Sequence, residues 1–391
     1  MSIKSVLILG ASGSVGAPIL AALLAEPIFT VTILSREKSS AEFPAGIPVK
    51  RVSDEFTTEE LTEAFHGQDA VVVALSTAPV TVEGKEKGNG EKGLAFRLID
   101  AAVAAGVKRF IPSEYGANNL DPRARTLVPI YDRKGEMLEY LIGSASSSLH
   151  LTWTSICCGS WLDWALDPSK SGDFLGIDVK GRKAIVYDSG LKTFSVTTSV
   201  NTGLAVAKTL RNPSLTANRQ IFLSDFTTST REIVAELESQ IGEKFDIDQK
   251  DSKPVIKELR ERFDKGEWEA TVALTSISFG ADVDVGYNYE KEQERSGSSN
   301  FQQTSADAIS LPRRLDIAIR PREHSRSAPP VDMLALLKLN ASTLISTASS
   351  SKSRSTIWLS KTSSSWPMAR VRSAAYTGFS ATATRTVFKK S

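Results

Sequence analysis

Three glycines near the start of the chain, Gly10, Gly13 and Gly16, have a spacing that suits the binding of a dinucleotide pyrophosphate. An apolar run precedes them and a segment compatible with a helix, residues 17–25, follows. The first glycine permits a tight turn, the second lets the backbone approach the pyrophosphate, and the third lets the helix pack on the strand. The N-terminus of that helix then faces the anion. The spacing is G-x-x-G-x-x-G rather than the standard G-x-G-x-x-G, and the expected cofactor contacts of this turn also include Ser12 and Val15.

The residue about 20 positions beyond the glycines selects between NAD and NADP, because an acidic side chain there binds the ribose 2′-hydroxyl and repels a 2′-phosphate. In this chain that residue is Arg36, which follows Ser35 at the end of an apolar run and precedes Lys38. A guanidinium offers a planar donor fork to a phosphate. The acidic Glu37 beside Arg36 favours NAD instead of NADP. The alternative interpretation of Arg36 is an ordinary solvated arginine at the end of a strand. We predict NADP(H), with Ser35, Arg36 and Lys38 at the 2′-phosphate.

Further polar candidates follow two later apolar runs, at Ser76, Ser113 and Glu114. The carboxyl ends of parallel strands meet at one edge of a sheet, where the nicotinamide would lie. Lys134 lies in a segment with a helical pattern. An ammonium beside the nicotinamide can stabilise a developing oxyanion or donate a proton if its neighbours lower its pKa. A helical lysine is also a common solvated surface residue, so spacing alone leaves both interpretations open.

Taken in order, these segments resemble the isoflavone reductase-like and NmrA-like branch of the atypical short-chain dehydrogenases. The resemblance rests on the glycine turn, Ser35-Arg36, the segment Arg109-Phe-Ile-Pro-Ser-Glu-Tyr-Gly116 and Lys134, and it fades after about residue 289. It implies NADPH-dependent reduction of an aromatic secondary metabolite, with Lys134 as both the proton-handling residue and a cofactor contact. The NmrA-like branch also includes proteins that bind the cofactor and control a partner without turnover, which is the alternative function.

The Tyr-x-x-x-Lys pair of ordinary short-chain dehydrogenases has no clear counterpart in this sequence. Tyr131 lies one residue too close to Lys134, and Tyr287 and Lys291 have the spacing but lie far beyond the predicted sheet. We interpret the second pair as coincidental. The absence of the pair supports the atypical branch and leaves the proton donor open.

The pattern of apolar runs and amphipathic segments up to about residue 156 is typical of an α/β fold with a doubly wound parallel sheet of the Rossmann type. Strands are predicted near residues 4–9, 29–34, 48–52, 70–75, 108–112 and 150–156, and helices near 14–25, 57–65, 90–106 and 129–143. Residues 1–160 are assigned to this NADP-binding domain and residues 161–296 to a smaller α/β substrate lobe, with strands near 184–187 and 220–224 and helices near 201–210, 228–241 and 254–263. Four aromatic residues follow or belong to the sixth strand and are either pocket walls or core: Trp153, Trp161, Trp164 and Phe174.

The net charge of the chain divides unevenly along its length. Residues 1–296 carry 33 basic and 41 acidic groups, whereas residues 297–391 carry 14 basic and 4 acidic groups. The acidic body shows no general basic footprint for nucleic acid. Serine and threonine make up 29 of the last 95 residues, a composition that predicts disorder. A basic interaction tail, an inert extension and a misread gene end all remain open for this low-complexity segment, and the last is slightly favoured.

The remaining composition excludes several classes of protein. The two cysteines, Cys157 and Cys158, are adjacent and do not form a disulfide framework. The three histidines are scattered without ligand spacing, so we expect neither a metal site nor a Ser-His-Asp triad. No apolar run reaches the length of a membrane span and no secretory signal is recognisable. We therefore expect a cytoplasmic enzyme, monomeric or weakly dimeric, that takes a small aromatic substrate and binds neither nucleic acid through its body nor a membrane.

Overall fold

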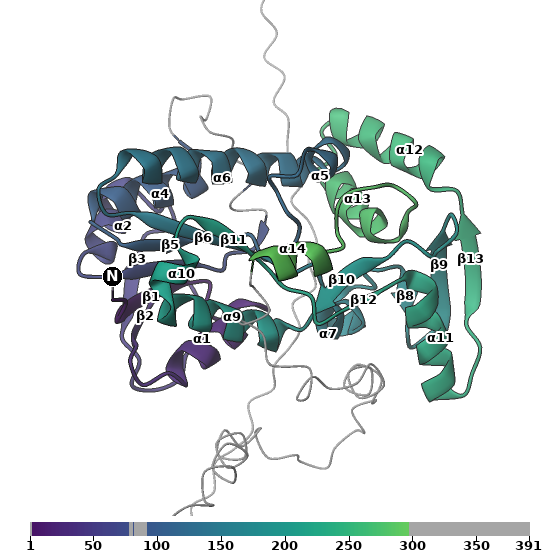
Figure 1. The fold of residues 1–391 in the computed structure, drawn as a ribbon, viewed down its shortest axis with the longest axis horizontal. Helices are drawn as coiled ribbons and strands as arrows, with labels where there is room; N and C mark the ends of the chain where they lie inside the picture. Colours follow the sequence, from purple (N-terminus) through teal and green to yellow (C-terminus); the bar gives the residue numbers. More distant parts are fainter. Residues whose placement is uncertain (1, 78–80, 82–91, 297–391) are drawn as a thin grey trace, which may run out of the picture. The chain divides into compact units, whose positions relative to one another are not determined.

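A seven-stranded parallel sheet in the order β11-β6-β5-β4-β1-β2-β3 forms the centre of the fold (Figure 1). The structure is a computed structural model, and it describes residues 2–77, 81 and 92–296. The strands are β1 (Ser5–Leu9), β2 (Thr30–Arg36), β3 (Val49–Val52), β4 (Ala70–Val73), β5 (Arg109–Ile111), β6 (Thr152–Cys157) and β11 (Arg219–Phe222). The strand order reverses between β1 and β4, and such a switch point is where open α/β sheets bind their ligands. The glycine turn directly follows β1.

Helices cover both faces of the sheet (Figure 1). On one face lie α1 (Gly16–Leu24), α9 (Ser199–Arg211) and α10 (Pro213–Thr216), and on the other lie α2 (Thr58–Phe65), α4 (Leu94–Ala104) and α6 (Pro129–Ser147). The short helix α5 (Pro122–Leu127) leads into α6. Every residue of β4 is buried, because a central parallel strand packs against helices on both sides. Gly203 of α9 lets this helix approach α1 closely, since a Cβ at Gly203 would lie 2.5 Å from the carbonyl oxygen of Pro18.

The remaining elements form a smaller lobe around two three-stranded sheets. One sheet has the order β12-β10-β7 and the other β13-β9-β8, formed by β7 (Ser160–Trp161), β8 (Ile177–Asp178), β9 (Lys183–Tyr187), β10 (Phe194–Thr197), β12 (Phe226–Thr228) and β13 (Asp246–Lys250). The helices of this part are α7 (Leu162–Ala165), α8 (Pro168–Ser171), α11 (Thr230–Ile241), α12 (Ser252–Asp264), α13 (Glu269–Gly280) and α14 (Glu290–Ser296).

The chain crosses between the two parts more than once. Although α9 and β11 follow residue 160 in the sequence, α9 packs on α1 and β11 pairs with β6 of the central sheet. The substrate lobe assigned to residues 161–296 is therefore interrupted by a segment that belongs to the layers of the large sheet. Later, the backbone N–H of Tyr289 donates to Ser195 Oγ of β10 at 2.8 Å, and its hydroxyl accepts from the N–H of Asn118 at 2.9 Å.

Arg109 of β5 is a fully buried cation that joins three elements. Its guanidinium donates to Thr154 Oγ1 and Thr216 Oγ1, both at 2.9 Å, and to the carbonyl oxygen of Pro213 at 2.6 Å. Burial lowers its pKa to about 10, so the group remains charged near neutral pH. Because its partners are neutral oxygens, Arg109 acts as a hydrogen-bonding link between β5, β6 and α10.

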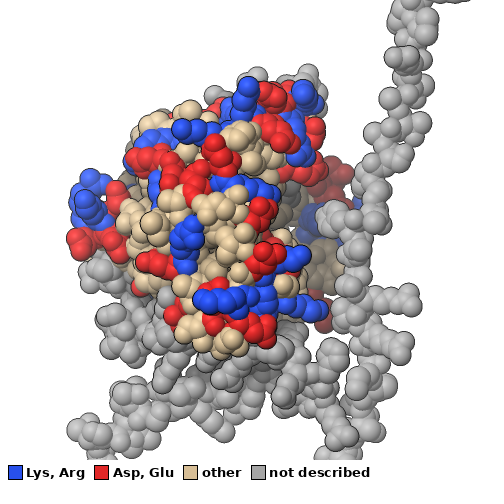
Figure 2. Space-filling view, turned by 90° about the vertical axis from the view of Figure 1, so that its right-hand side faces the viewer, with Lys and Arg blue, Asp and Glu red and all other residues tan. Residues whose placement is uncertain are grey.

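The fold class predicted from the sequence is confirmed, and the strands and helices of the first 157 residues lie within a few residues of their predicted positions. The sequence patterns missed α13, β13, the short strands of the second lobe and the short helices α5, α7, α8, α10 and α14. Among the described residues, no helix is long and apolar enough to cross a membrane. On the face that Figure 2 shows, basic and acidic side chains are interspersed. The tail assigned to residues 297–391 lies outside the described residues.

Candidate active site

The glycine turn after β1 is built so that only hydrogen atoms fit at two of its positions. Gly10 has φ +77°, and a Cβ there would lie 2.3 Å from the carbonyl oxygen of Ala74. A Cβ at Gly16 would lie 1.9 Å from the carbonyl oxygen of Gly10, so α1 can begin directly against the turn. Gly13 donates from its N–H to the same oxygen at 3.0 Å. Gly13 and Val15 face the cavity described below, whereas Ser12 is exposed beside it.

A group of basic side chains lies at the carboxyl end of β2, where the sequence predicts the 2′-phosphate. Arg36 and Lys38 both pair with Asp54, at 3.3 and 3.2 Å, and both are largely exposed. Arg51 of β3, which the sequence analysis missed, donates to Ser35 Oγ at 3.3 Å and to the carbonyl oxygen of Arg36 at 2.8 Å. Three cations thus gather at the carboxyl end of β2, two of them on Asp54 and one on Ser35, a donor set that suits a dianionic phosphate.

A cavity of about 520 Å³ opens between the glycine turn, the ends of β4 and β5, helix α6 and the smaller lobe. Six of the sequence candidates line it: Gly13, Val15, Ser76, Ser113, Glu114 and Lys134. Its other lining residues include Ser14, Tyr115, Tyr131, Ser160, Trp161, Trp164, Phe174, Val272, Thr275 and Phe279. The fold therefore brings these candidates to one place, as expected for the carboxyl edge of a parallel sheet.

Lys134 lies on the buried side of α6 and is 7% exposed. Its Nζ donates to the carbonyl oxygens of Ser113 at 2.7 Å and Glu114 at 3.1 Å. An ammonium has three donors, so one hydrogen is left after these two contacts. Burial lowers the pKa of Lys134, while the negative charge of Glu114 opposes that shift. Because Lys134 is buried, the interpretation of this residue as a solvated surface lysine is wrong.

Glu114 supplies the buried carboxyl group next to this lysine. Its Oε2 accepts from Asn119 Nδ2 at 2.6 Å, and burial raises its pKa against the lowering effect of Lys134. The neighbouring Ser113 donates from Oγ to the carbonyl oxygen of Leu75 at 2.7 Å, which ties the end of β5 to the segment after β4. Ser76, next along that segment, is exposed at the cavity edge.

Aromatic side chains form part of the cavity wall. Trp164 packs between Trp161 and Phe174, with ring centroids 6.4 and 5.4 Å away. The indole N–H of Trp161 is held by Cys158 Sγ and by Thr202 Oγ1, each 3.1 Å away. Trp153, by contrast, is buried among core residues of the sheet. Phe279 of α13 completes the wall, a contribution that the sequence analysis missed because it predicted no helix there.

The second tyrosine–lysine pair of the sequence does not form a site. Tyr287 is buried and exchanges a hydrogen bond of 2.9 Å with Ser278, whereas Lys291 is exposed on α14. Within the described ranges, no group of three or more His, Cys, Asp or Glu side chains is arranged to hold a metal ion. The titratable residues that line the described cavity are Glu114, Tyr115, Tyr131 and Lys134.

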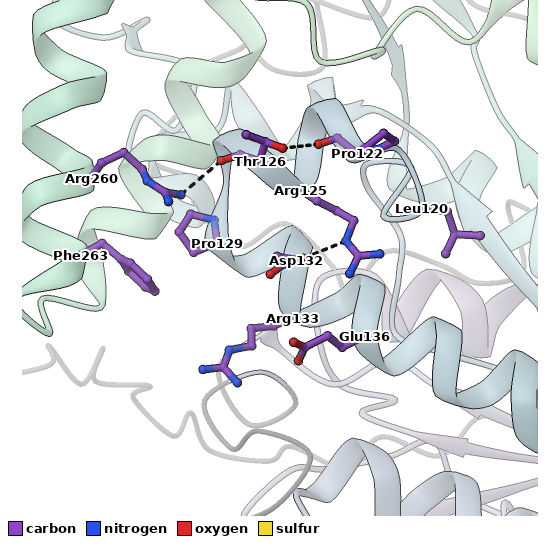
Figure 3. A pocket seen from close by; sticks show the side chains of 10 residues that line it. All are labelled: Leu120, Pro122, Arg125, Thr126, Pro129, Asp132, Arg133, Glu136, Arg260 and Phe263. Carbon is purple, nitrogen blue, oxygen red and sulfur yellow. Dashed lines mark hydrogen bonds and ion pairs between the residues drawn. The ribbon is translucent and has the colours of Figure 1, made fainter.

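A second hollow of about 730 Å³ lies on the other side of α6, between α5, α6 and α12 (Figure 3). Its walls carry Arg125, which pairs with Asp132 at 2.8 Å, and Arg260, whose Nη1 lies 3.4 Å from the carbonyl oxygen of Thr126. Arg133 and Glu136 reach it from the exposed face of α6. Lys134 belongs to the opposite face of the same helix, so this outer groove is separate from the candidate active site.

Comparisons with known proteins support the same interpretation. The profile of an NAD(P)H-binding family matches residues 10–173. Oxidoreductase aprR of Aspergillus flavus is 34% identical over 267 residues, which cover 68% of this chain and 83% of that protein. Oxidoreductase poxI of Penicillium oxalicum is 33% identical over 259 residues, 66% of this chain and 76% of that protein. A further relative, from Aspergillus hancockii, is an NmrA-like family domain-containing oxidoreductase, 25% identical over 161 residues, 40% of this chain and 46% of its own length.

The chain belongs to the isoflavone reductase-like and NmrA-like family. It is accordingly an NAD(P)H-binding oxidoreductase, and the resemblance predicted from the sequence is confirmed. Solved structures share the fold of this family member. An isoflavone reductase superposes with a TM-score of 0.54 at 19% identity, covering 72% of this chain and 88% of that one. A structure described as "AtPrR2 with NADP+ and (+)pinoresinol" gives 0.54 at 18% identity, covering 75% and 95%.

Proposed function

We propose that this protein is an NADPH-dependent reductase of aromatic or conjugated small molecules, in which Lys134 assists proton transfer. The observation that carries the proposal is the position of Lys134. Lys134 is a buried residue of a cavity that is also lined by the glycine turn and by aromatic side chains. A cofactor on the glycine turn and a flat acceptor against the tryptophans would then both lie next to this amine.

The residues that would hold the cofactor fit its chemistry. Gly10, Gly13 and Gly16 leave the backbone bare where the pyrophosphate must approach, and the N-terminus of α1 follows at once. Ser35, Arg36 and Lys38, with Arg51, would bind the 2′-phosphate that distinguishes NADPH from NADH. When bound, the reduced nicotinamide supplies a hydride to an acceptor carbon and leaves as NADP⁺, and a proton completes the two-electron reduction.

Lys134 is the candidate for handling that proton. Its pKa is lowered by burial, which brings a lysine closer to the working range of a general acid. Its two carbonyl contacts hold Nζ in place, and its positive charge would stabilise an oxyanion that develops on the acceptor. Lys134 holds the carbonyl oxygens of Ser113 and Glu114, and we expect these two residues to contact the cofactor. Ser76, at the edge of the cavity, is a further expected cofactor contact.

The aromatic class of substrate is proposed from the cavity wall. Trp161, Trp164, Phe174 and Phe279 offer ring faces and edges, and such surfaces bind planar ligands well. The neighbour described with (+)pinoresinol binds an aromatic ligand in the same fold. We also propose that the enzyme works as a monomer or weak dimer in the cytoplasm, which is consistent with its two free, buried cysteines.

The experiment that tests the proposal is a titration of the purified full chain with NADPH and NADH, followed by an acceptor screen. We expect tighter binding of NADPH, and loss of its absorbance with at least one aromatic enone or ketone. Binding without turnover across the panel, with different affinities for NADP⁺ and NADPH, would instead indicate the cofactor-sensing function. Absence of nucleotide binding by the folded protein would refute both.

A further inference from the structure

Tyr115 is a cavity residue that the proposed function leaves without a role. It follows Glu114 at the end of β5, is 6% exposed and lines the same cavity as Lys134. Its hydroxyl is buried and meets no hydrogen-bond partner within residues 2–77, 81 and 92–296. Buried polar groups in proteins are usually paired. Of the buried side-chain atoms that have no partner among the described residues, the Tyr115 hydroxyl is the one whose residue lines this cavity.

The polar groups near Tyr115 form hydrogen bonds with other side chains or with backbone carbonyl oxygens. Glu114 accepts from Asn119, Cys158 accepts from Trp161, and Ser113 donates to a backbone carbonyl. Lys134 donates to the carbonyl oxygens of Ser113 and Glu114. Among the described residues, none of these groups pairs with the Tyr115 hydroxyl, although Asn119 Oδ1 is also unpaired and Lys134 keeps one free donor.

The backbone of Tyr115 also departs from ordinary geometry. Its φ is +32°, in the left-handed region that a bulky side chain rarely adopts. Such a conformation costs about 1 kcal/mol or more and persists where its surroundings enforce it. Lys134 supplies part of that enforcement, because one of its contacts is the carbonyl oxygen of Glu114, in the peptide unit that leads into Tyr115. The contact therefore holds the peptide unit that precedes the tyrosine.

We propose that the Tyr115 hydroxyl donates a hydrogen bond to an oxygen of the acceptor, and so selects aromatic substrates that carry a carbonyl oxygen. This inference rests on the proposed function and narrows its substrate class. Burial raises the pKa of Tyr115 far above neutrality, so the phenol stays protonated and donates without giving up its proton. Lys134 then supplies the proton, and Tyr115 orients the acceptor oxygen that receives it. These two residues together take the role that the Tyr-x-x-x-Lys pair has in ordinary short-chain dehydrogenases.

The test compares Tyr115→Phe with the wild-type full chain in the presence of saturating NADP⁺, where no reduction can occur. The probes are chalcone, an aromatic enone, and trans-stilbene, which has two aromatic rings but no oxygen. Tryptophan fluorescence, to which Trp161 and Trp164 contribute, reports their binding. We expect Tyr115→Phe to weaken chalcone binding about 3- to 10-fold, the effect of one hydrogen bond, and to leave stilbene binding within about 2-fold.

Tyr187→Phe is the matched control, because Tyr187 belongs to β9 and is not among the cavity residues. It should leave both affinities unchanged. Thermal unfolding gives a second readout. Because the Tyr115 hydroxyl has no hydrogen-bond partner among the described residues, Tyr115→Phe should unfold at or above the wild-type temperature, and chalcone should raise its midpoint less than that of the wild type.

Three results would overturn the inference. Equal loss for chalcone and stilbene would mean that the ring and not the hydroxyl matters, and failure of the wild-type NADP⁺ complex to bind chalcone would exclude this substrate class. A weaker affinity of Tyr115→Phe for NADP⁺ itself would assign the hydroxyl to the nucleotide. Each is separate from failure of the proposed function, which would appear in the wild type as no NADP(H) binding or no turnover of any acceptor.

Discussion

The side-chain amine of Lys134 and the carbonyl oxygen of Ser113 are 2.7 Å apart, and this contact ties the first half of α6 to the segment that follows β5. The hydroxyl of Ser113 continues the connection by donating to the carbonyl oxygen of Leu75 after β4. Neutral backbone oxygens therefore hold the amine, and the nearby carboxyl of Glu114 acts on it through its charge. This arrangement keeps Lys134 in place while leaving its protonation adjustable.

The first prediction concerns the chemistry of Lys134. In Lys134→Met a side chain of similar length replaces the amine, so we expect kcat/KM with an aromatic acceptor to fall about 100-fold or more, as for loss of a general acid. The dissociation constant for NADPH should change far less, because the glycine turn and the cations of β2 are untouched. Steady-state kinetics and a nucleotide titration on the same preparation measure both quantities.

Lys257→Met on α12 is the control for that variant, since Lys257 is 80% exposed and is not among the cavity residues. It should retain wild-type kinetics. If Lys134→Met lost NADPH affinity in proportion to its activity, the amine would be a cofactor anchor and not a proton-handling group.

The second prediction concerns pH. The negative charge of Glu114 raises the pKa of Lys134 against the lowering effect of burial, so Glu114→Gln removes a raising influence and the pKa of Lys134 falls further. If protonated Lys134 is the acid, the decline of kcat/KM at alkaline pH should begin at a lower pH in Glu114→Gln than in the wild type. Glu136→Gln, on the exposed face of the same helix, should leave the profile in place. An alkaline limb that stays or moves upward would contradict this coupling.

The parts of this site that could be predicted from the sequence are those that depend on neighbours along the chain. Gly10, Gly13 and Gly16 form one turn, and Arg36 lies at the end of the strand that follows it, so a local pattern identifies them. Arg51 reaches Ser35 only because β3 pairs in parallel with β2, with Arg51 opposite Ser35. That register depends on packing, and the sequence alone did not determine it.

The cavity wall was less predictable for a related reason. Phe279 lies on α13, a helix with no charged residues beyond its first turn, so its apolar positions show little helical periodicity. Tyr115 was visible within its motif, but only the folded arrangement shows that its hydroxyl has no hydrogen-bond partner among the described residues. The return of α9 and β11 to the large sheet is likewise a long-range effect, set by contacts with α1 and β6.

The third prediction assigns the 2′-phosphate to the basic cluster. Arg36→Met should weaken NADPH binding about 10- to 100-fold, the effect of one or two charge-assisted hydrogen bonds, and Arg51→Met should weaken it in the same direction. NADH binding is the internal control and should stay within about 2-fold in both variants. The NADPH effect should also shrink at high ionic strength, because Arg36 is exposed. Parallel loss of NADH affinity would show that these arginines support the fold of the site and not the phosphate.

The last prediction separates the shape of the glycine turn from the general cost of changing a glycine. In Gly16→Ala the new Cβ would lie 1.9 Å from the carbonyl oxygen of Gly10, a backbone atom that cannot move without shifting the turn. We expect the free energy of unfolding to drop by about 3 kcal/mol or more, together with loss of nucleotide binding. Gly143→Ala, on the exposed side of α6 with no atom within 4 Å of its new Cβ, should instead stabilise the protein by up to about 1 kcal/mol. Urea unfolding monitored by circular dichroism measures both. A Gly16→Ala protein as stable as the wild type would show that α1 can move away from β1, and the close approach of helix and strand on which the pyrophosphate site depends would then be wrong.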